Sequence, residues 1–440
     1  MRATRLACVL TTGMAAQLCA QTPLSFREAL TVSRQHNRQL RAAGAQVERS
    51  RAARAAARGL YFPSVSAVGL YAHLNDPLFV DVSGVRATVQ QNDPYKASLT
   101  ARWTVFAGGG ILAANGAARA GVVAAEQEQR GTEQGVTTEL VDRYFKRRLA
   151  ADVLEVRRQA LETFTRHLDD AHRLQAAGQI ARTDELRAEV ARAEADRELR
   201  KAARDVDLAS VALKSTLGNE VDATPTTPLA LITGLEPLAT FAAAADSGNA
   251  TIGRLAALRE QARQGVRAAR AELLPSISVF GTQELAQGKL NSTTDPKWIV
   301  GLFARWELFD GFARLNRLQS ARHLEEAVGF EHQQAKNEVA TLVQLRYDEY
   351  ESALEQYRSL ETTLALAQES LRSERKAYEA AVGTSLAVID AELALSRVQV
   401  DRLTALYDLD LALARLLEAS GQSNRFPEYL DRATLAEALR

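Results

Sequence analysis

Few side chains in this sequence are spaced as catalytic or metal-binding groups usually are. The six histidines include no His-Glu-x-x-His pairing, which would place two zinc ligands on one face of a helix. His167 and His172 lie five residues apart on a predicted helix, off a common face, and this favours a solvated helix surface over a metal site. No constellation of acid, base and nucleophile is visible. We therefore expect no enzyme and no cofactor.

Two further patterns could in principle bind phosphate or nucleic acid. Gly108-Gly109-Gly110 lies between a predicted strand and a predicted helix, but it lacks both the GxGxxG spacing and the Lys-Ser/Thr of a P-loop, which favours a flexible turn. The run from Arg49 to Arg58 alternates with alanine, which favours one exposed helix face. Lys+Arg and Asp+Glu both number 54, so the formal net charge is zero and no nucleic-acid partner is expected.

Residues 1–20 have the pattern of a secretory signal peptide. Two arginines precede an uncharged, mostly apolar stretch, and Ala20 is a small residue before a cut. Lipidation at Cys19 is the alternative, although Leu18 is bulky for the position before a lipidated cysteine. Cleavage after Ala20 would remove both cysteines, Cys8 and Cys19, and with them any disulfide or cysteine metal site.

The remainder of the chain contains two copies of one sequence pattern. Asn37 precedes Pro63 by the same 26 residues (63 − 37) that separate Asn249 from Pro275 (275 − 249). Further on, Arg102-Trp103-Thr104-Val105-Phe106 is answered by Arg305-Trp306-Glu307-Leu308-Phe309, and other landmarks follow at the same shift. Order of this kind indicates a duplication. We expect a first repeat at residues 21–218, an irregular connector at 219–237, a second repeat at 238–421 and a tail at 422–440.

Each repeat is predicted to begin with one helix, roughly residues 26–60 or 241–274, that a proline ends. Two strands follow, at about 62–73 and 95–106 in the first repeat and at about 275–285 and 297–309 in the second. Residues 95–106 alternate apolar and polar side chains with a period of two, which predicts a sheet with one apolar face. Trp103, Trp298 and Trp306 fall in or beside these strands, as aromatic residues at a membrane interface do. The half-buried sheet of a soluble protein is the alternative.

A long helical hairpin is predicted to complete each repeat, at residues 111–218 and 312–421. Residues 111–177 and 312–382 contain no proline, so each stretch can form a helix on the order of 100 Å long. Apolar residues such as Tyr350, Leu354 and Tyr357 recur at steps of three and four, which is typical of coiled coils. We expect the chain to reverse at Gly178 and Gly383.

Four strands in one chain cannot close on themselves. No later stretch approaches 18 uncharged apolar residues, so any membrane crossing would use strands. An open sheet edge in lipid leaves backbone groups without partners, and small closed barrels need about eight strands. Several copies would therefore have to combine their strands, and three copies would form a twelve-stranded ring, with the long helices packed side by side into a second tube.

In this order of elements the chain resembles the TolC family of outer membrane efflux proteins. Phe106-Ala107-Gly108-Gly109 and Phe309-Asp310-Gly311 resemble the family's Phe-Asp-Gly-Gly turn, and residues 178–184 and 383–386 resemble its periplasmic hairpin tips. The resemblance implies a mainly α fold with a transmembrane β-barrel section. It also implies a duplicated channel-tunnel, in which long hairpins would form a helical barrel and three chains would supply four strands each to a twelve-stranded β-barrel.

The resemblance also implies a function and partners. The implied function is that of a homotrimeric channel that exports small molecules or peptides. This channel would lie in the outer-membrane lipid and extend into the periplasm. A periplasmic adaptor (membrane fusion protein) and an inner-membrane transporter would supply the cargo. The competing hypothesis is a periplasmic coiled-coil adaptor or scaffold, which would normally carry one hairpin among compact β domains. The sequence indicates neither the cargo nor the class of pump.

The resemblance assigns the hairpin tips to adaptor docking, with Ile180 and Leu386 as exposed apolar contacts and with Gln179 and Ser385 accessible. The family's second tip often carries two aspartates in Asp-Val-Leu-Asp-Ala, which constrict the entrance. Here Ala387-Val388-Ile389-Asp390-Ala391 keeps Asp390 alone, so the resemblance implies at most a single ring of carboxylates; an ordinary helix-surface residue is the alternative. The residues assigned to docking are Gly178, Gln179, Ile180, Thr183, Asp184, Gly383, Thr384, Ser385 and Leu386.

Overall fold

The computed structural model describes residues 22–219, 221–290, 297–380 and 382–435. The predicted signal peptide and both cysteines lie outside these residues. The chain divides into two units, and both repeats contribute to each. We call residues 42–132 and 245–341 the strand unit. We call the described part of the remainder, which holds residues 133–244 and 342–435, the hairpin unit.

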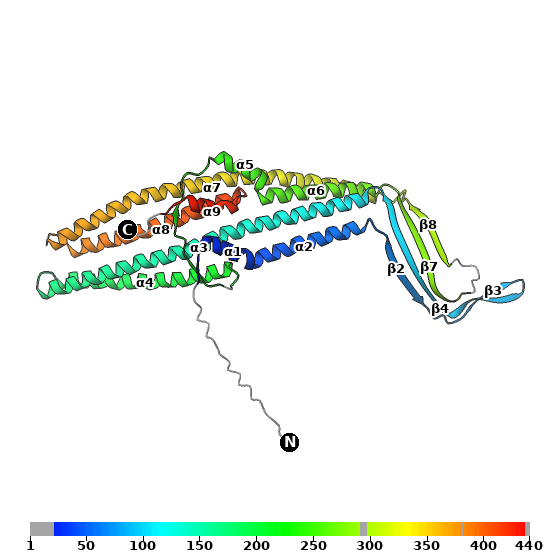
Figure 1. Cartoon of the computed structure of the whole chain (residues 1–440), viewed down its shortest axis with the longest axis horizontal. Coiled ribbons are helices and arrows are strands. Elements are labelled where there is room, and N and C mark those ends of the chain that lie inside the picture. The colour runs from blue at the N-terminus through cyan, green and yellow to red at the C-terminus, as the bar shows by residue number, and fades with distance from the viewer. Residues whose placement is uncertain (1–21, 220, 291–296, 381, 436–440) are drawn as a thin grey trace, which may run out of the picture. The chain divides into compact units, whose positions relative to one another are not determined.

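An antiparallel sheet lies in the strand unit, with the order β2 (Ser64–Tyr71), β4 (Val85–Ala107), β7 (Ser276–Leu290) and β8 (Trp298–Arg305) (Figure 1). The register brings Ala101 beside Val65 and Gly281, and Trp103 beside Val279, which in turn lies beside Leu302. One face of the sheet is therefore mainly apolar. The other face carries polar side chains that contact one another between strands, and there Thr100 Oγ1 lies 3.1 Å from Thr282 Oγ1.

The strand boundaries differ from the prediction in two places. β4 begins about ten residues before the expected start at Tyr95, and it pairs with an additional strand, β3 (Leu78–Val82), that was not predicted. Ser83 and Gly84 join these strands with positive φ angles of 53° and 80°, the geometry of a tight hairpin turn. β8 ends at Arg305, so the predicted strand residues Trp306–Phe309 lie outside it.

Helices of the strand unit pack closely where glycine meets glutamine. The helical part of the strand unit consists of most of α2 (Arg38–Gly59), the first parts of α3 (Gly110–Ala176) and α7 (Ala313–Glu379), and α6 (Ala250–Ala271). The close contacts described next join α3 and α6. A Cβ atom on Gly116 of α3 would lie 2.7 Å from the side chain of Gln264, and one on Gly253 of α6 would lie 2.8 Å from that of Gln127. The two contacts are eleven residues apart on each helix (127 − 116 and 264 − 253), which fixes the register of an antiparallel pair.

The prediction of a single helix at the start of each repeat is wrong. In both repeats an asparagine divides this segment into two helices. In the first repeat the two helices are α1 (Phe26–His36) and α2. The Oδ1 atom of Asn37 accepts hydrogen bonds from the backbone N–H groups of residues 39 and 40 and so caps α2. In the second repeat, Asn249 caps α6 in the same way, directly after α5 (Leu238–Gly248). An asparagine at the N-cap satisfies amides that would otherwise lack partners, and this restarts the helix.

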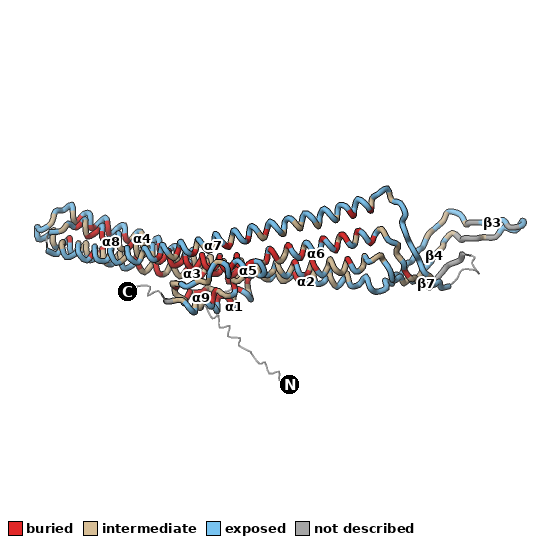
Figure 2. Tube along the Cα trace, turned by 90° about the horizontal axis from the view of Figure 1, so that it is seen from above, coloured by how far each residue is buried: buried red, intermediate tan, exposed pale blue. Residues whose placement is uncertain are grey.

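Two helical hairpins dominate the hairpin unit. The remainder of α3 is followed by α4 (Arg182–Thr216), and the remainder of α7 by α8 (Ser385–Ala419). The glycines after α4 and α8, Gly218 and Gly421, adopt positive φ angles of 85° and 75°, as helix-ending glycines do. Figure 2 shows buried residues at intervals along these helices.

The connector, which was predicted to be irregular, forms short strands, and the tail contributes to one of their pairings. β5 (Ala223–Pro225) pairs in parallel with β1 (Thr22–Leu24), and β6 (Ala230–Leu231) pairs with β9 (Thr434–Leu435). The tail also forms a short 3₁₀ turn, η1 (Ser423–Arg425), and α9 (Phe426–Arg432).

Aromatic side chains form the core around this connector. Phe26 lies 5.5 Å from Tyr144 and 5.2 Å from Phe426 between ring centroids. The Tyr144 hydroxyl donates to the carbonyl oxygen of Leu24 (2.7 Å) and accepts from two backbone amides of the connector. This tyrosine therefore fastens the connector to α3.

Candidate docking site at the hairpin tips

Glycine closes both hairpin tips, for different reasons. Gly178 has a φ of +71°, and the amide of Gln179 donates to the carbonyl oxygen of Leu174 (2.9 Å), which ends α3. At Gly383 the chain passes so close to the end of α7 that a Cβ atom would lie 2.8 Å from the backbone nitrogen of Tyr378. Thr384 then caps α8, because its Oγ1 accepts from the amide of residue 387 (3.2 Å).

Each hairpin has an ion pair of its own near the tip. In the first hairpin the buried carboxylate of Glu185 on α4 lies 2.6 Å from Nδ1 of His172 on α3 and also pairs with Arg182. The hydrogen bond from Arg182 is the main cause that lowers the pKa of Glu185. In the second hairpin Glu392 on α8 pairs with Arg375 on α7. Burial raises the pKa of Glu392 despite this partner.

A second set of contacts joins the two hairpins to each other. His167 Nε2 on α3 lies 2.9 Å from Ser385 Oγ on α8, and farther along Arg157 Nη1 donates to Ser396 Oγ (2.9 Å). Phe164, which is 2% exposed, packs with Ile389 of α8 in an apolar cluster. Sequence reasoning missed these links, because the residues that form them are more than 200 positions apart and follow no local pattern.

A groove of about 760 Å³ opens beside these contacts, between the two hairpins. Its wall combines apolar side chains with charges of both signs, which suits a protein segment with a mixed surface better than a purely apolar ligand. The lining residues are Thr163, Phe164, Arg166, His167, Asp170, Arg173, Leu174, Gln179, Ile180, Arg375, Tyr378, Glu379, Gly383, Val388, Ile389 and Glu392.

The structure corrects three expectations about accessibility at the tips. Ser385 is buried rather than accessible, since it faces His167. Ile180 is half-buried in the groove and not fully exposed, whereas Leu386 is exposed. His167 is half-buried beside the groove and not fully exposed to solvent, and its ring centroid lies 5.5 Å from that of Tyr378.

The other docking candidates have the following positions. Gly178, Gln179, Thr183 and Thr384 are exposed, and Asp184 is half-buried and pairs with Arg187 (3.2 Å). Asp390, the proposed constriction, is exposed on α8. The groove thus brings Gln179, Ile180 and Gly383 together, while Asp390 is not among its lining residues.

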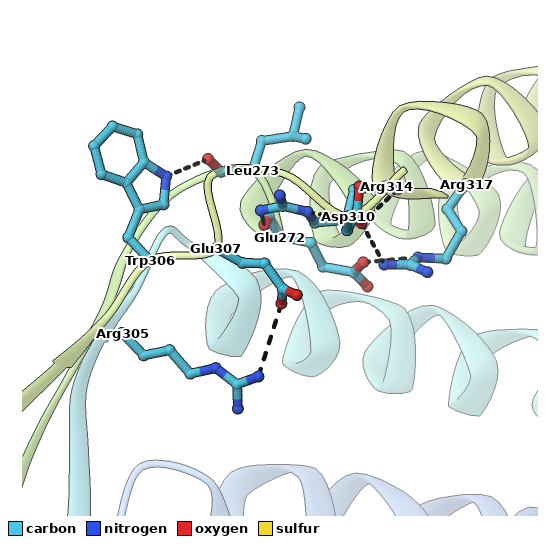
Figure 3. A network of polar contacts seen from close by, with 8 residues as sticks. All are labelled: Glu272, Leu273, Arg305, Trp306, Glu307, Asp310, Arg314 and Arg317. Carbon is cyan, nitrogen blue, oxygen red and sulfur yellow. Dashed lines mark hydrogen bonds and ion pairs between the residues drawn. The ribbon is translucent and has the colours of Figure 1, made fainter. Parts of the chain in front are cut away.

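The predicted interface tryptophans are all exposed, and two of them make equivalent hydrogen bonds. Trp103 Nε1 donates to the carbonyl oxygen of Tyr61 (2.9 Å), and Trp306 Nε1 donates to that of Leu273 (3.3 Å; Figure 3). Trp298, the first residue of β8, is 66% exposed.

A charged network surrounds the turn that follows β8 (Figure 3). Asp310 accepts from the backbone amide of Arg314 and from its Nε, both at 3.0 Å, and Arg314 also donates to the carbonyl oxygen of Glu272 (3.2 Å). Burial raises the pKa of Asp310, but these hydrogen bonds outweigh it, so the pKa lies below its ordinary value. The first repeat has Ala107 at the corresponding position and cannot form this network.

Neither a metal site nor a membrane-spanning helix is found in the described part of the chain. No cluster of three or more histidine, cysteine, aspartate or glutamate residues there could hold a metal ion. No helix within residues 22–435, apart from the undescribed gaps, is long and apolar enough to cross a membrane.

Known proteins resemble this chain in sequence. A family model described as outer membrane efflux protein matches residues 29–219 and 243–422, more than half of the chain. The alkaline protease secretion protein AprF of Pseudomonas aeruginosa is 24% identical over 299 residues, which are 66% of this chain and 62% of AprF. The chain therefore spans less than two thirds of the length of this curated relative.

Solved structures of outer-membrane proteins share the fold. The outer-membrane channel OprN has a TM-score of 0.77 at 22% identity, with 90% of each chain covered. The outer membrane protein VceC of Vibrio cholerae has a TM-score of 0.74 at 18% identity, covering 90% of this chain and 96% of its own. These matches confirm the predicted fold class, a mainly helical channel-tunnel chain.

Proposed function

Because this chain belongs to the outer membrane efflux protein family, we propose that three copies of it form an export channel. The protein lies in the outer membrane and extends into the periplasm. The family is one of efflux proteins and not of enzymes. The channel carries small molecules or peptides, and the similarity to AprF, an alkaline protease secretion protein, favours peptides among the cargo.

The sheet of the strand unit carries this proposal. Within the described residues, β2 and β8 each pair with one strand only, so the backbone groups along their outer edges need partners. In lipid an unpaired edge costs several kcal/mol per group, which favours pairing with the edges of neighbouring copies. Three copies of the four strands β2, β4, β7 and β8 would give a closed ring of about twelve, wide enough for a channel.

The hairpin tips supply the docking surface in this proposal. A periplasmic adaptor would present its own helical hairpin to the groove beside His167, and an inner-membrane transporter would deliver the cargo. Exposed Gln179 and Leu386 border this region and offer one polar and one apolar contact. A periplasmic adaptor or scaffold function for the chain itself is not favoured, because the family match covers both repeats.

Conductance measurements in planar bilayers test the channel and its entrance together. Three Asp390 carboxylates near a common axis would attract multivalent cations, so added trivalent cations should block the wild-type conductance, and Asp390→Ala should remove the block. Asp401→Ala, on the same helix, is the matched control and should keep it. Block that persists in Asp390→Ala would make Asp390 a surface carboxylate, whereas absence of any conductance would contradict the channel itself.

A further inference from the structure

His167 occupies the junction between the two hairpins. It lies on α3, and its Nε2 is within hydrogen-bond distance of the Oγ of Ser385, the first residue of α8. Ser385 is 3% exposed and His167 is half-buried, so the serine side of this contact is shielded from water. On the α7 side the ring packs against Tyr378, whose hydroxyl oxygen is also buried. One imidazole therefore touches both helices of the second hairpin from its place on the first.

The charged side chains on α3 near His167 include both an aspartate, which favours the protonated imidazole, and arginines, which disfavour it. Asp170 favours a charged imidazole, but it is already paired with Arg173. Arg166 also lines the groove and adds positive charge. The carboxylate on this helix is thus largely balanced by neighbouring guanidinium groups.

The second hairpin brings charges of both signs towards His167. Arg375 on α7 disfavours a charged imidazole, although Glu392 on α8 neutralises part of its charge. Glu379 on α7 lines the same groove. The N-terminus of α8, where Ser385 lies, carries the positive end of the helix dipole, which disfavours a cation there. Tyr378 is neutral at physiological pH, and burial raises the pKa of its hydroxyl further.

The surroundings of His167 determine how the strength of its contact with Ser385 changes with pH. Burial lowers the pKa of His167, Asp170 offsets part of this, and Arg375 adds to it. A proton therefore binds more tightly when the hairpins separate and the ring meets water. The contact is at full strength above the ordinary histidine pKa of about 6.5 and weakens as the pH falls below it.

We propose that His167 and Ser385 form a pH-sensitive link that holds the two hairpins together at neutral pH and releases them in an acidic periplasm. Release would widen the groove at the tips. Its consequence for adaptor docking rests on the proposed function, but the release itself does not. His172 is not part of the link, because it is exposed and pairs with Glu185 inside the first hairpin.

Thiol accessibility measures the release directly. With Cys8 and Cys19 replaced by serine, Val388→Cys places a reporter at a buried groove position, and Leu386→Cys provides an exposed reference two residues away. The ratio of their labelling rates corrects for the pH dependence of reactivity that the two thiols share. In the trimeric full-length protein, the ratio should rise severalfold between about pH 7.5 and pH 5.5, which bracket the histidine range.

Substitutions then assign the effect to His167. His167→Gln keeps a neutral hydrogen-bonding group and should make the ratio independent of pH, while the matched control His172→Gln should leave the wild-type rise. A flat ratio in the unsubstituted His167 background, or a rise that persists in His167→Gln, would overturn the proposal. Ile389→Cys serves as a second buried reporter if Val388→Cys assembles poorly. Because no transport is measured, a missing channel activity would not alter this result.

Discussion

The indole nitrogen of Trp103 donates a hydrogen bond of 2.9 Å to the backbone carbonyl oxygen of Tyr61, which lies two residues before Pro63. Trp306 makes the same contact with Leu273, two residues before Pro275, at 3.3 Å. In both repeats, therefore, a tryptophan near the end of the strand that precedes the long helix, within β4 or directly after β8, is tied to the turn that leads into the first strand. The duplication is preserved in a specific hydrogen bond and not only in the sequence pattern.

Trp103→Phe should lower stability, because phenylalanine keeps an aromatic ring and removes the donor. We expect a loss of about 0.5–1.5 kcal/mol, and a smaller loss for Trp306→Phe, whose bond is longer. Thermal unfolding of the purified protein in detergent measures both. Equal stability of Trp103→Phe and the wild type would show that the bond contributes nothing.

Gly108 and Gly109 should differ sharply in their tolerance of alanine. Both have positive φ angles, of 58° and 90°, so alanine at either costs roughly 1–2 kcal/mol of backbone strain. A Cβ atom on Gly108 would also lie 2.7 Å from the carbonyl oxygen of Ala271, whereas one on Gly109 would meet nothing within 4 Å. Yield and melting temperature should fall further for Gly108→Ala, and the reverse order would contradict this packing.

Asp410 should make stability depend on pH. It is fully buried on α8, and burial raises its pKa well above the ordinary value, although the backbone of Ala230 favours the charged form. Its contribution to stability is complete below the ordinary aspartate pKa and is lost as the pH rises towards the raised value. Asp410→Asn should therefore stabilise the protein more at about pH 8 than at about pH 5.

The repeat supplies the control for this experiment. Asp207 is the counterpart of Asp410 on α4, and it is exposed. Asp207→Asn should leave the melting temperature nearly unchanged at both pH values. If Asp410→Asn shifts the melting temperature equally at both, the carboxyl group does not change its protonation on folding in this range.

Adjacent residues of β4 should respond in opposite ways to arginine. Leu99 lies on the apolar face of the sheet, which we propose faces lipid, and Thr100 lies on the opposite face against Thr282. Arginine on a lipid-facing strand position costs about 2–4 kcal/mol at mid-depth. Leu99→Arg should reduce assembly in outer membranes far more than Thr100→Arg, as quantified on native gels. Equal assembly of the two variants would show that the face with Leu99 does not face lipid.

The sequence predicted the features that repeat or alternate. The period of two in residues 95–106 predicted a strand, and the steps of three and four around Tyr350 and Tyr357 predicted a buried helix face, where both side chains are nearly inaccessible. The division of the first helix could also have been predicted, because Asn37 and Asn249 are favourable N-caps at corresponding positions.

Features that depend on distant parts of the chain were not predictable in this way. The contact between His167 and Ser385 arises only when two hairpins meet, and the burial of Ser385 follows from it. Ser83-Gly84 does carry a hairpin signal, but the flanking residues lack a clear alternation, so β3 was missed. The order of strands across the repeats, with β4 beside β7, likewise depends on packing that no local pattern encodes.

Chemical cross-linking in native membranes tests the central claim most directly. If three copies combine their strands in the outer membrane, the protein should fractionate with that membrane, require detergent for extraction and give a cross-linked trimer as its largest product. A monomer recovered from the soluble periplasm without detergent would contradict the account.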